Sequence, residues 1–281
     1  MDREKLLIIG CGDLGRRLAQ QLEGSNIAIT GLRRHPPAST PAITYCPLDA
    51  SDGQALMQVM AQNFDTVVIT LTPQSRSDEG YVAGYVTPAE LLVKVLKQLQ
   101  VRPRLILFVS STAVYGQDQG EWVDEGSLTK PTAFNGKRLL QAEETLLHSG
   151  LPVSVLRLSG IYGPGRARLL NKVATGKAPL QNHWTNRIHA DDAAGFMAHL
   201  LVLSRRQPLA PVYLVSDSEP ARSAEVVSWL ASQLSVGTGP REPVLDLNKR
   251  VNNRLLLASG FELQYPDYKT GFIDLLIRKS P

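Results

Sequence analysis

The chain has 281 residues, of which 43 % are hydrophobic and 20 % are charged, and its formal net charge is +4 at pH 7. This composition is typical of a globular protein with a sizeable core. The Lys and Arg residues are scattered along the chain, which argues against a protein that binds nucleic acid. No apolar run reaches the length of a membrane span or a signal-peptide core, so we expect a cytoplasmic protein that does not bind a membrane.

Short apolar runs alternate with amphipathic stretches through the first 160 residues. The runs are apolar on both faces, as expected of parallel strands that are covered by helices. Strands are predicted at residues 5–9, 27–30, 43–46, 66–71, 104–110 and 153–158, and helices at 14–22, 53–62, 87–99 and 133–148. Repeated units of this kind predict an α/β fold with a doubly wound parallel sheet.

After residue 158 the elements become shorter and less regular. Helices are predicted at 167–174, 191–203 and 223–234, a strand at 212–215, and two late helices near 247–258 and 269–277. We therefore predict a main domain of residues 1–158, to which 186–205 return, and a smaller C-terminal lobe of 159–185 and 206–281 that would bind the substrate.

A glycine-rich loop, LLIIGCGDLG, follows the first predicted strand and opens a helix. This context and the G-x-G-x-x-G spacing predict a dinucleotide-binding loop. Gly10 would permit the tight turn, Gly12 the approach of a pyrophosphate, and Gly15 close helix–strand packing, while the helix start would face the phosphates. An ordinary tight turn is the alternative. The predicted cofactor contacts here are Gly10, Gly12, Asp13, Leu14 and Gly15.

The two cysteines, Cys11 and Cys46, offer neither a disulfide framework nor a metal-binding spacing, and we predict no metal. Cys11 lies inside the glycine-rich loop. It could act as a redox switch, but a small thiol that fills a buried niche is the favoured interpretation.

The second predicted strand ends in ITGLRR, where an NAD-binding protein would carry an acidic residue for the ribose hydroxyls. This stretch has no carboxylate and carries Arg33 and Arg34 instead. A guanidinium group can bind a 2′-phosphate through paired hydrogen bonds, which favours NADP over NAD. Both arginines could alternatively be ordinary exposed loop residues.

Two aspartates follow the third predicted strand, in PLDASD. Asp49 is expected at the carboxyl end of that strand, where its carboxylate could accept a hydrogen bond from an adenine amino group. Asp52 precedes the helical stretch GQALMQVM and is predicted to cap it.

Five motifs occur in the order found in the extended short-chain dehydrogenases/reductases, which are NAD(P)-dependent epimerases and dehydratases acting largely on nucleotide sugars. They are the glycine loop, LDASD, VSSTAVYG (109–116), RLSGIYGPGR (157–166) and NRIHADDAA (186–194). The chain resembles this family over nearly its whole length, which implies a Rossmann fold. Ile9 stands where most extended members carry an additional glycine, a departure that resembles the atypical branch.

The resemblance implies several further site residues. Asp49 matches the acid that contacts adenine, and Leu71 and Thr72 match a segment that passes along the cofactor ribose. Ser111, counted back from Tyr115, matches the catalytic Ser/Thr position. Its hydroxyl could bind a substrate oxygen, or it could only cap nearby backbone.

The catalytic tyrosine and lysine of the family are absent from PTAFNGKRLLQAEE. A gapless match to the usual Y-x-x-x-K pattern puts Asn135 at the tyrosine and Leu139 at the lysine. Asn135 can orient a ligand but cannot ionise, and Leu139 cannot lower a neighbour's pKa. Loss of such a pair should slow the usual reaction by about 10²–10⁴-fold.

Other side chains could supply the missing proton or hold the substrate. Tyr81, Tyr85 and Tyr162 are candidates, although packing tyrosines are the favoured interpretation. The resemblance implies that Arg166 and Arg187 anchor an anionic substrate, and exposed loop arginines are the alternative.

Two functional hypotheses follow. The first is an NADP-favouring oxidoreductase of the epimerase/dehydratase type, acting on a small anionic or nucleotide-sugar-like molecule by a non-standard acid/base route. The second is a non-catalytic protein that binds or senses NADP(H) on the same fold. A homodimer through helices 87–99 and 133–148 is conceivable, but core packing explains their apolar positions equally well.

Overall fold

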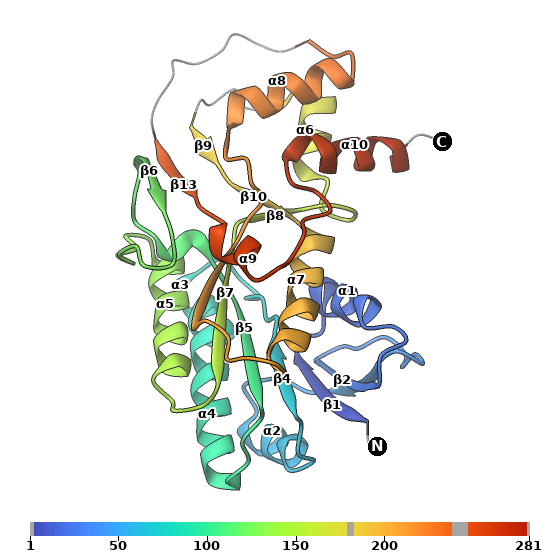
Figure 1. Cartoon of the computed structure of the whole chain (residues 1–281), viewed down its shortest axis with the longest axis vertical. Coiled ribbons are helices and arrows are strands. Elements are labelled where there is room, and N and C mark those ends of the chain that lie inside the picture. Colours follow the sequence, from blue (N-terminus) through green and yellow to red (C-terminus); the bar gives the residue numbers. More distant parts are fainter. Residues whose placement is uncertain (1–2, 179–182, 238–246, 280–281) are drawn as a thin grey trace. The chain divides into compact units, whose positions relative to one another are not determined.

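The computed structural model describes residues 3–178, 183–237 and 247–279 (Figure 1). Its centre is a seven-stranded sheet in the order β11-β7-β5-β4-β1-β2-β3. The pairs β1–β2, β1–β4, β2–β3 and β4–β5 are parallel, and the predicted doubly wound sheet is confirmed. The strands are β1 (Glu4–Ile9), β2 (Ile27–Arg33), β3 (Thr44–Pro47), β4 (Thr66–Ile69), β5 (Leu105–Ser111), β7 (Val153–Leu158) and β11 (Val212–Val215).

Helices cover both faces of this sheet. Figure 1 shows α4 and α5 side by side on one face and α1 and α7 on the other. Because both faces are covered, the central strands are apolar throughout; Leu6, Leu7 and Ile8 in β1 are fully buried. The helices are α1 (Asp13–Gln21), α2 (Gly53–Met60), α4 (Thr87–Leu99), α5 (Phe134–Leu147) and α7 (Ala190–Leu203).

Two short helical segments between β4 and α4 were not predicted. The one-turn helix α3 (Asp78–Tyr81) leads directly into a π-helical turn, η1 (Val82–Val86). A Cβ atom at Gly84 would lie 2.9 Å from Cα of Pro73. Glycine therefore lets η1 pack directly on the backbone that leaves β4.

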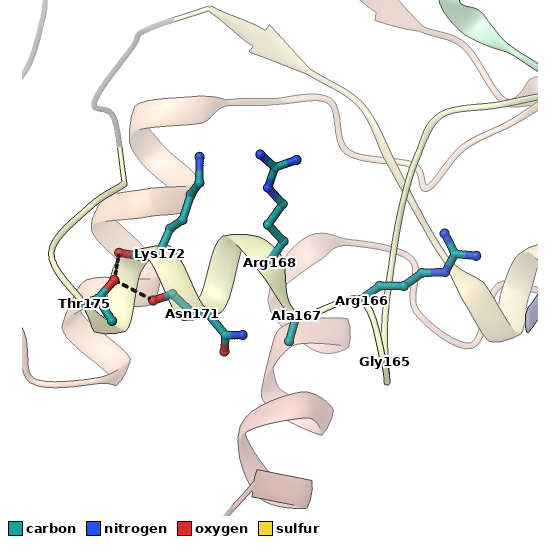
Figure 2. Close-up of a pocket in the computed structure, with 7 residues that line it drawn as sticks. All are labelled: Gly165, Arg166, Ala167, Arg168, Asn171, Lys172 and Thr175. Carbon is teal, nitrogen blue, oxygen red and sulfur yellow. Dashed lines mark hydrogen bonds between the residues drawn. The ribbon is translucent and has the colours of Figure 1, made fainter. Parts of the chain in front are cut away.

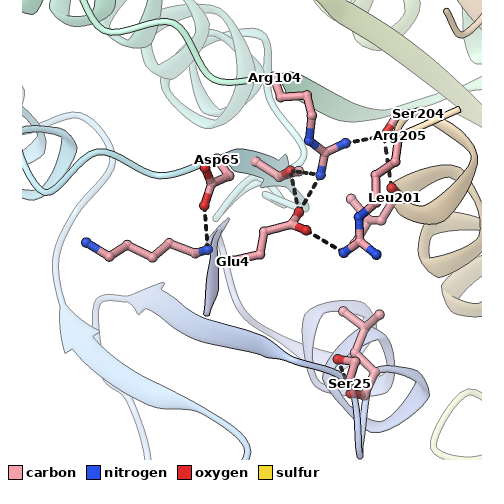
Figure 3. Close-up of polar contacts among 10 residues, drawn as sticks. Glu4, Ser25, Asp65, Arg104, Leu201, Ser204 and Arg205 are labelled. Carbon is pink, nitrogen blue, oxygen red and sulfur yellow. Dashed lines mark hydrogen bonds and ion pairs between the residues drawn. The ribbon is translucent and has the colours of Figure 1, made fainter. Parts of the chain in front are cut away.

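A polar cluster closes the amino-terminal edge of the sheet (Figure 3). Glu4 at the start of β1 accepts hydrogen bonds from Arg104, Arg205 and the Thr66 hydroxyl, and Arg104 also bonds Ser204. The single carboxylate of Glu4 thus joins β1 to β4, to the start of β5 and to the end of α7.

The chain divides into two compact units. Unit 1 contains Met1–Tyr115, Thr129–Arg157 and Ala194–Tyr213, and unit 2 contains Gly116–Leu128, Leu158–Ala193 and Leu214–Pro281. In unit 2, β6 (Gln119–Val123) pairs with β13 (Asn248–Val251), β8 (Gly160–Tyr162) with β10 (Arg187–His189), and β9 (Trp184–Thr185) with β12 (Ala221–Arg222). Its helices are α6 (Arg168–Ala174), α8 (Ser223–Gln233), α9 (Arg254–Ala258) and α10 (Tyr268–Lys279).

Two predictions for the second half of the chain need correction. The strand predicted at 212–215 is present with these bounds as β11, but it pairs with β7 in the central sheet and not with strands of a smaller lobe. The helix expected near 247–258 is the strand β13 followed by the short helix α9. The amide of Asn248 donates to the carbonyl of Asp118 at 2.9 Å, so this long-range pairing overrides the local helical pattern.

Among the described residues, no helix has both the length and the apolar character needed to cross a membrane.

Candidate functional site

The glycine loop forms the tight turn that the sequence predicts. Gly10 has φ +80°, and a Cβ atom there would lie 2.9 Å from the backbone of Leu71. A Cβ atom at Gly15 would lie 2.9 Å from Cγ2 of Ile8 in β1. Both positions therefore require glycine, Gly10 for the turn and Gly15 for the close contact of α1 with β1.

Gly12 differs from the other two glycines of the loop. It is the N-cap of α1, and the nearest atom to a Cβ built there is the carbonyl oxygen of Gly10 at 3.7 Å. Protein packing thus leaves room beside Gly12, at the positive end of the α1 dipole. Asp13 pairs with Arg17 at 3.1 Å, and Leu14 is buried.

A cavity of about 570 Å³ lies in unit 1 over the carboxyl ends of β1, β2 and β3. Residues of α3 and η1 form another part of its wall. The predicted cofactor residues that line it are Gly10, Gly12, Arg33, Arg34, Asp49, Leu71 and Thr72, whereas Asp13, Leu14 and Gly15 do not line it. Residues far apart in sequence, from the glycine loop to Thr72, are therefore brought to one cavity.

The acidic and basic residues of this cavity have different environments. Oδ1 of Asp49 accepts hydrogen bonds from the amide and hydroxyl of Ser51, at 3.0 and 2.7 Å. These bonds, assisted by Arg34, lower the pKa of Asp49, which keeps its carboxylate ionised. Arg33 and Arg34 are exposed side chains on the cavity wall. Asp52 caps α2 as predicted, with Oδ1 accepting from two amides at 3.0 and 3.1 Å.

Cys11 fills a niche beneath the loop, as the favoured interpretation predicts. Its side chain is fully buried. Cβ atoms built at Gly15 and Gly31 would lie 3.1 and 2.8 Å from its Sγ. Burial raises the pKa of the Cys11 thiol, which keeps it in the unreactive protonated form.

Ser111 and the start of α5 lie next to each other. Ser111 ends β5, and its Oγ accepts a hydrogen bond from the amide of Ala113 at 3.2 Å, which caps the 3₁₀ turn η2 (Thr112–Val114). A Cβ atom at Gly136 would lie 2.3 Å from the Ala113 carbonyl oxygen. This contact places Asn135, the residue before Gly136, beside the Ser111 turn. Neither Ser111 nor Asn135 lines the cavity described above.

Leu139 is a core residue. Only 4 % of its surface is exposed, whereas Lys137 on the same helix is exposed. The position that matches the family's lysine is thus occupied by an apolar side chain packed in the interior of unit 1.

A buried ionic network behind Ser111 was missed by the sequence analysis. Arg157 donates to both carboxylate oxygens of Glu143, with Nη2–Oε2 at 2.7 Å, and to the Tyr115 hydroxyl at 2.7 Å. Ser110 donates to Glu143 at 2.5 Å. The arginine inside the apolar run VSVLRL is the signal that could have revealed the pair, because a buried charge requires a partner.

Three aromatic rings gather where α3 and η1 meet the start of α5. The Tyr81 ring lies edge-on to Phe134, with centroids 5.5 Å apart, and 5.4 Å from the Tyr85 ring. Tyr162, in unit 2, is a packing tyrosine: its ring lies 4.8 Å from Phe272 and is buried.

The two arginines predicted to hold substrate lie in unit 2, in different settings. Arg166 precedes α6 and lines a shallow pocket of about 480 Å³ together with Arg168 and Lys172. Figure 2 shows Arg168 and Lys172 extending to the same side of α6. Arg187 is buried in β10, where desolvation lowers its pKa and the charge of Asp217 opposes that shift.

In the described part of the chain, no group of three or more His, Cys, Asp or Glu side chains is placed to hold a metal ion.

Comparison with known proteins assigns the chain to a family. The model of the NAD dependent epimerase/dehydratase family matches residues 6–215. The chain belongs to this family. Protein YeeZ of Escherichia coli K12 is 31 % identical over 284 residues, covering 94 % of this chain and 97 % of that protein.

Solved structures of the epimerase/dehydratase type share the fold. A provisionally named NAD-dependent epimerase/dehydratase from Methylobacillus flagellatus has a TM-score of 0.86 and 35 % identity, covering 98 % of each chain. The UDP-glucuronic acid 4-epimerase of Bacillus cereus, solved with NAD, has a TM-score of 0.77 at 17 % identity, covering 97 % of this chain and 99 % of that one.

Proposed function

We propose that the protein is an NADP-favouring oxidoreductase of the epimerase/dehydratase type that acts on a nucleotide-sugar-like or other small anionic substrate. The observation that carries the proposal is the cavity of unit 1, which joins Gly10 and Gly12 to Asp49 and to two exposed arginines. The open space beside Gly12 suits a pyrophosphate at the start of α1. Asp49 would bind adenine, and Leu71 and Thr72 would follow the ribose.

The preference for NADP rests on Arg33 and Arg34. Both line the cavity together with Asp49. The stretch ITGLRR, which ends β2, contains no carboxylate residue of its own. Guanidinium groups at this point would bind a 2′-phosphate and would give no comparable advantage to a ribose hydroxyl. Asp13, Leu14 and Gly15 would contribute the helix start and its close packing on β1.

An anionic substrate is supported by the basic pocket at α6. Arg166, Arg168 and Lys172 line it together (Figure 2), and a phosphate group would be stabilised by such a cluster. Arg187 would act from its buried position in β10, where partial neutralisation by an anion would offset the cost of burying the guanidinium.

The chemical step would follow a non-standard route. Asn135 immediately precedes Gly136, which packs on the turn that Ser111 caps. Both side chains, Ser111 and Asn135, would orient a substrate oxygen through hydrogen bonds, but neither can take up a proton at neutral pH. A bound nicotinamide dinucleotide supplies hydride transfer. The proton must therefore move through another side chain of this chain.

A second candidate is a non-catalytic NADP(H)-binding protein. Two observations favour it: Leu139 is buried in the core, and the Ser111 hydroxyl already caps η2. Binding of NADP(H) without turnover would then be the whole function of the cavity.

Turnover separates the two candidates. NADP⁺ and NADPH are each incubated with UDP-sugars and aldehydes, with absorbance read at 340 nm and the sugar products analysed by chromatography. We expect the wild type to convert at least one of these compounds and a Gly12→Ala variant to convert none. Tight NADPH binding with no product across the panel would support the non-catalytic candidate.

A further inference from the structure

The reaction proposed above needs an ionisable group near the start of α5, where Asn135 cannot serve. Three of the five tyrosines in unit 1 have their hydroxyls engaged elsewhere. Tyr115 accepts a hydrogen bond from Arg157 at 2.7 Å, Tyr213 accepts one from a backbone amide at 3.1 Å, and Tyr45 shares one with the buried Cys11. These three are therefore committed to structural contacts, which leaves Tyr81 and Tyr85.

Tyr81 is held against the first residue of α5. Its ring lies edge-on to Phe134 at 5.5 Å between centroids, and Phe134 immediately precedes Asn135. The helix that carries Tyr81 is also tied to α5 by an ion pair. Nε and Nη2 of Arg138 donate to the two carboxylate oxygens of Asp78 at 2.8 and 2.7 Å. Tyr81 thus has a fixed place beside Asn135.

The same segment forms part of the wall of the dinucleotide cavity. Glu79, Gly80, Ala83 and Gly84 line the cavity, and they flank Tyr81 in α3 and η1. Tyr81 itself does not line the cavity, but it belongs to the segment that joins the cavity wall to the start of α5. The π-helical turn that follows it is a rare conformation, found frequently at functional sites.

Tyr85 is the less suitable of the two tyrosines. Its ring lies edge-on to Phe108 of the sheet at 6.4 Å. Burial raises the pKa of Tyr85 to about 12, because the phenolate would lose its solvation. Tyr81 and Tyr85 are both partly exposed to solvent, so the contacts of the two rings, and not their exposure, separate them.

We propose that Tyr81 is the catalytic acid/base that replaces the tyrosine absent from α5, an inference that rests on the proposed function. In the oxidation direction, the hydroxyl proton of the substrate passes to the phenolate oxygen of Tyr81. The electron pair of the adjacent C–H bond leaves as hydride to NADP⁺, and the substrate becomes a carbonyl compound. In reduction, the Tyr81 hydroxyl returns the proton to the alkoxide oxygen as hydride arrives on carbon.

The test uses NMR of the full-length protein labelled with ¹³C at the tyrosine Cζ atoms, with NADP⁺ as the probe. Tyr81→Phe identifies the Tyr81 signal. Tyr85→Phe is the matched control, because each variant removes one hydroxyl and keeps the ring stack. The positive nicotinamide ring should favour the nearby phenolate. The Tyr81 signal should therefore shift when NADP⁺ is added.

The outcome decides the proposal in each case. Binding of NADP⁺ is followed by fluorescence in the same samples. If NADP⁺ binds and the Tyr81 signal does not move, the role of Tyr81 is overturned and the cofactor site is left intact. A response of Tyr85 alone would also overturn it. Absence of NADP⁺ binding would overturn both this proposal and the proposed function. On any sugar that the wild type converts, Tyr81→Phe should lower kcat by about 10²–10⁴-fold, and Tyr85→Phe should not.

Discussion

The guanidinium of Arg157 and the carboxylate of Glu143 form a buried ion pair, with Nη2–Oε2 at 2.7 Å and both side chains at most 6 % exposed. The pair joins β7 to α5. Ser110, which precedes Ser111 in β5, donates to the same carboxylate. This buried charge pair therefore helps to hold α5 against the Ser111 turn.

Glu143→Gln should destabilise the fold strongly, because it leaves the Arg157 charge buried without its counter-ion. Removal of one partner of a buried pair costs about 3–5 kcal/mol. Urea unfolding measures the loss. The double variant Glu143→Gln/Arg157→Met should recover much of it, since no unpaired charge remains. A loss below about 1 kcal/mol for Glu143→Gln would contradict the role given to this pair.

Gly10→Ala and Gly12→Ala should separate folding from cofactor binding. A methyl group at Gly10 meets the Leu71 backbone at 2.9 Å and sits at positive φ, so we expect a loss of about 1–3 kcal/mol in unfolding free energy. A methyl group at Gly12 meets no protein atom closer than 3.7 Å. It should spare stability and weaken NADPH binding tenfold or more. Equal stability losses in both variants would contradict the assignment of Gly12 as the pyrophosphate contact.

The ion pair of Asp78 with Arg138 should respond to acid. Hydrogen bonds from Arg138 lower the pKa of Asp78 below its ordinary value of about 3.9. A depressed pKa in the folded state means that the pair stabilises the fold fully above that ordinary value and loses its contribution as the pH falls through the lowered pKa.

The comparison is between wild type and Asp78→Asn, whose unfolding midpoints in urea are measured at pH 7 and near pH 3. The difference between the two proteins should be present at pH 7 and should shrink in acid. A difference in unfolding midpoint that grows as the pH falls would contradict the stabilising role of the Asp78–Arg138 pair.

Cys46 should react with a thiol reagent well before Cys11. Cys11 is fully buried with a raised pKa, and Cys46 is partly exposed. Folded protein treated with Ellman's reagent should therefore release one equivalent rapidly, and the second only on unfolding. Cys46→Ser should abolish the rapid phase. A rapid phase that survives this substitution would place Cys11 in reach of solvent and revive its interpretation as a redox switch.

Local patterns in the sequence were sufficient to predict six of the seven strands of the central sheet, together with the glycine loop. The strands are apolar on both faces because they are covered on both sides, and Thr87–Leu99 was predicted to the residue. Gly10 and Gly15 are each required for a single steric reason, which follows from the strand–turn–helix context. Short-range rules of this kind need no knowledge of the rest of the chain.

Long-range contacts explain what the sequence analysis missed. The strand β13 exists because Asn248–Val251 pairs with Gln119–Val123, more than a hundred residues earlier. The Glu143–Arg157 pair joins a helix to a strand. The apolar run VSVLRL indicates that Arg157 is buried, but no local pattern identifies Glu143 as its partner. The placement of Tyr81 depends on the turn η1 and on its contact with Phe134, which no local pattern indicates.

Titration of the protein with NADPH and with NADH, followed by nucleotide fluorescence, tests the central claim most directly. The claim is that the cavity with Gly12, Arg33 and Arg34 binds a dinucleotide and prefers the 2′-phosphate. NADPH should bind at least about tenfold more tightly, since a charge-assisted hydrogen bond contributes about 1.5–3 kcal/mol. Arg33→Ala/Arg34→Ala should abolish that preference and leave NADH binding unchanged. Tighter binding of NADH, or no binding of either nucleotide, would contradict the account.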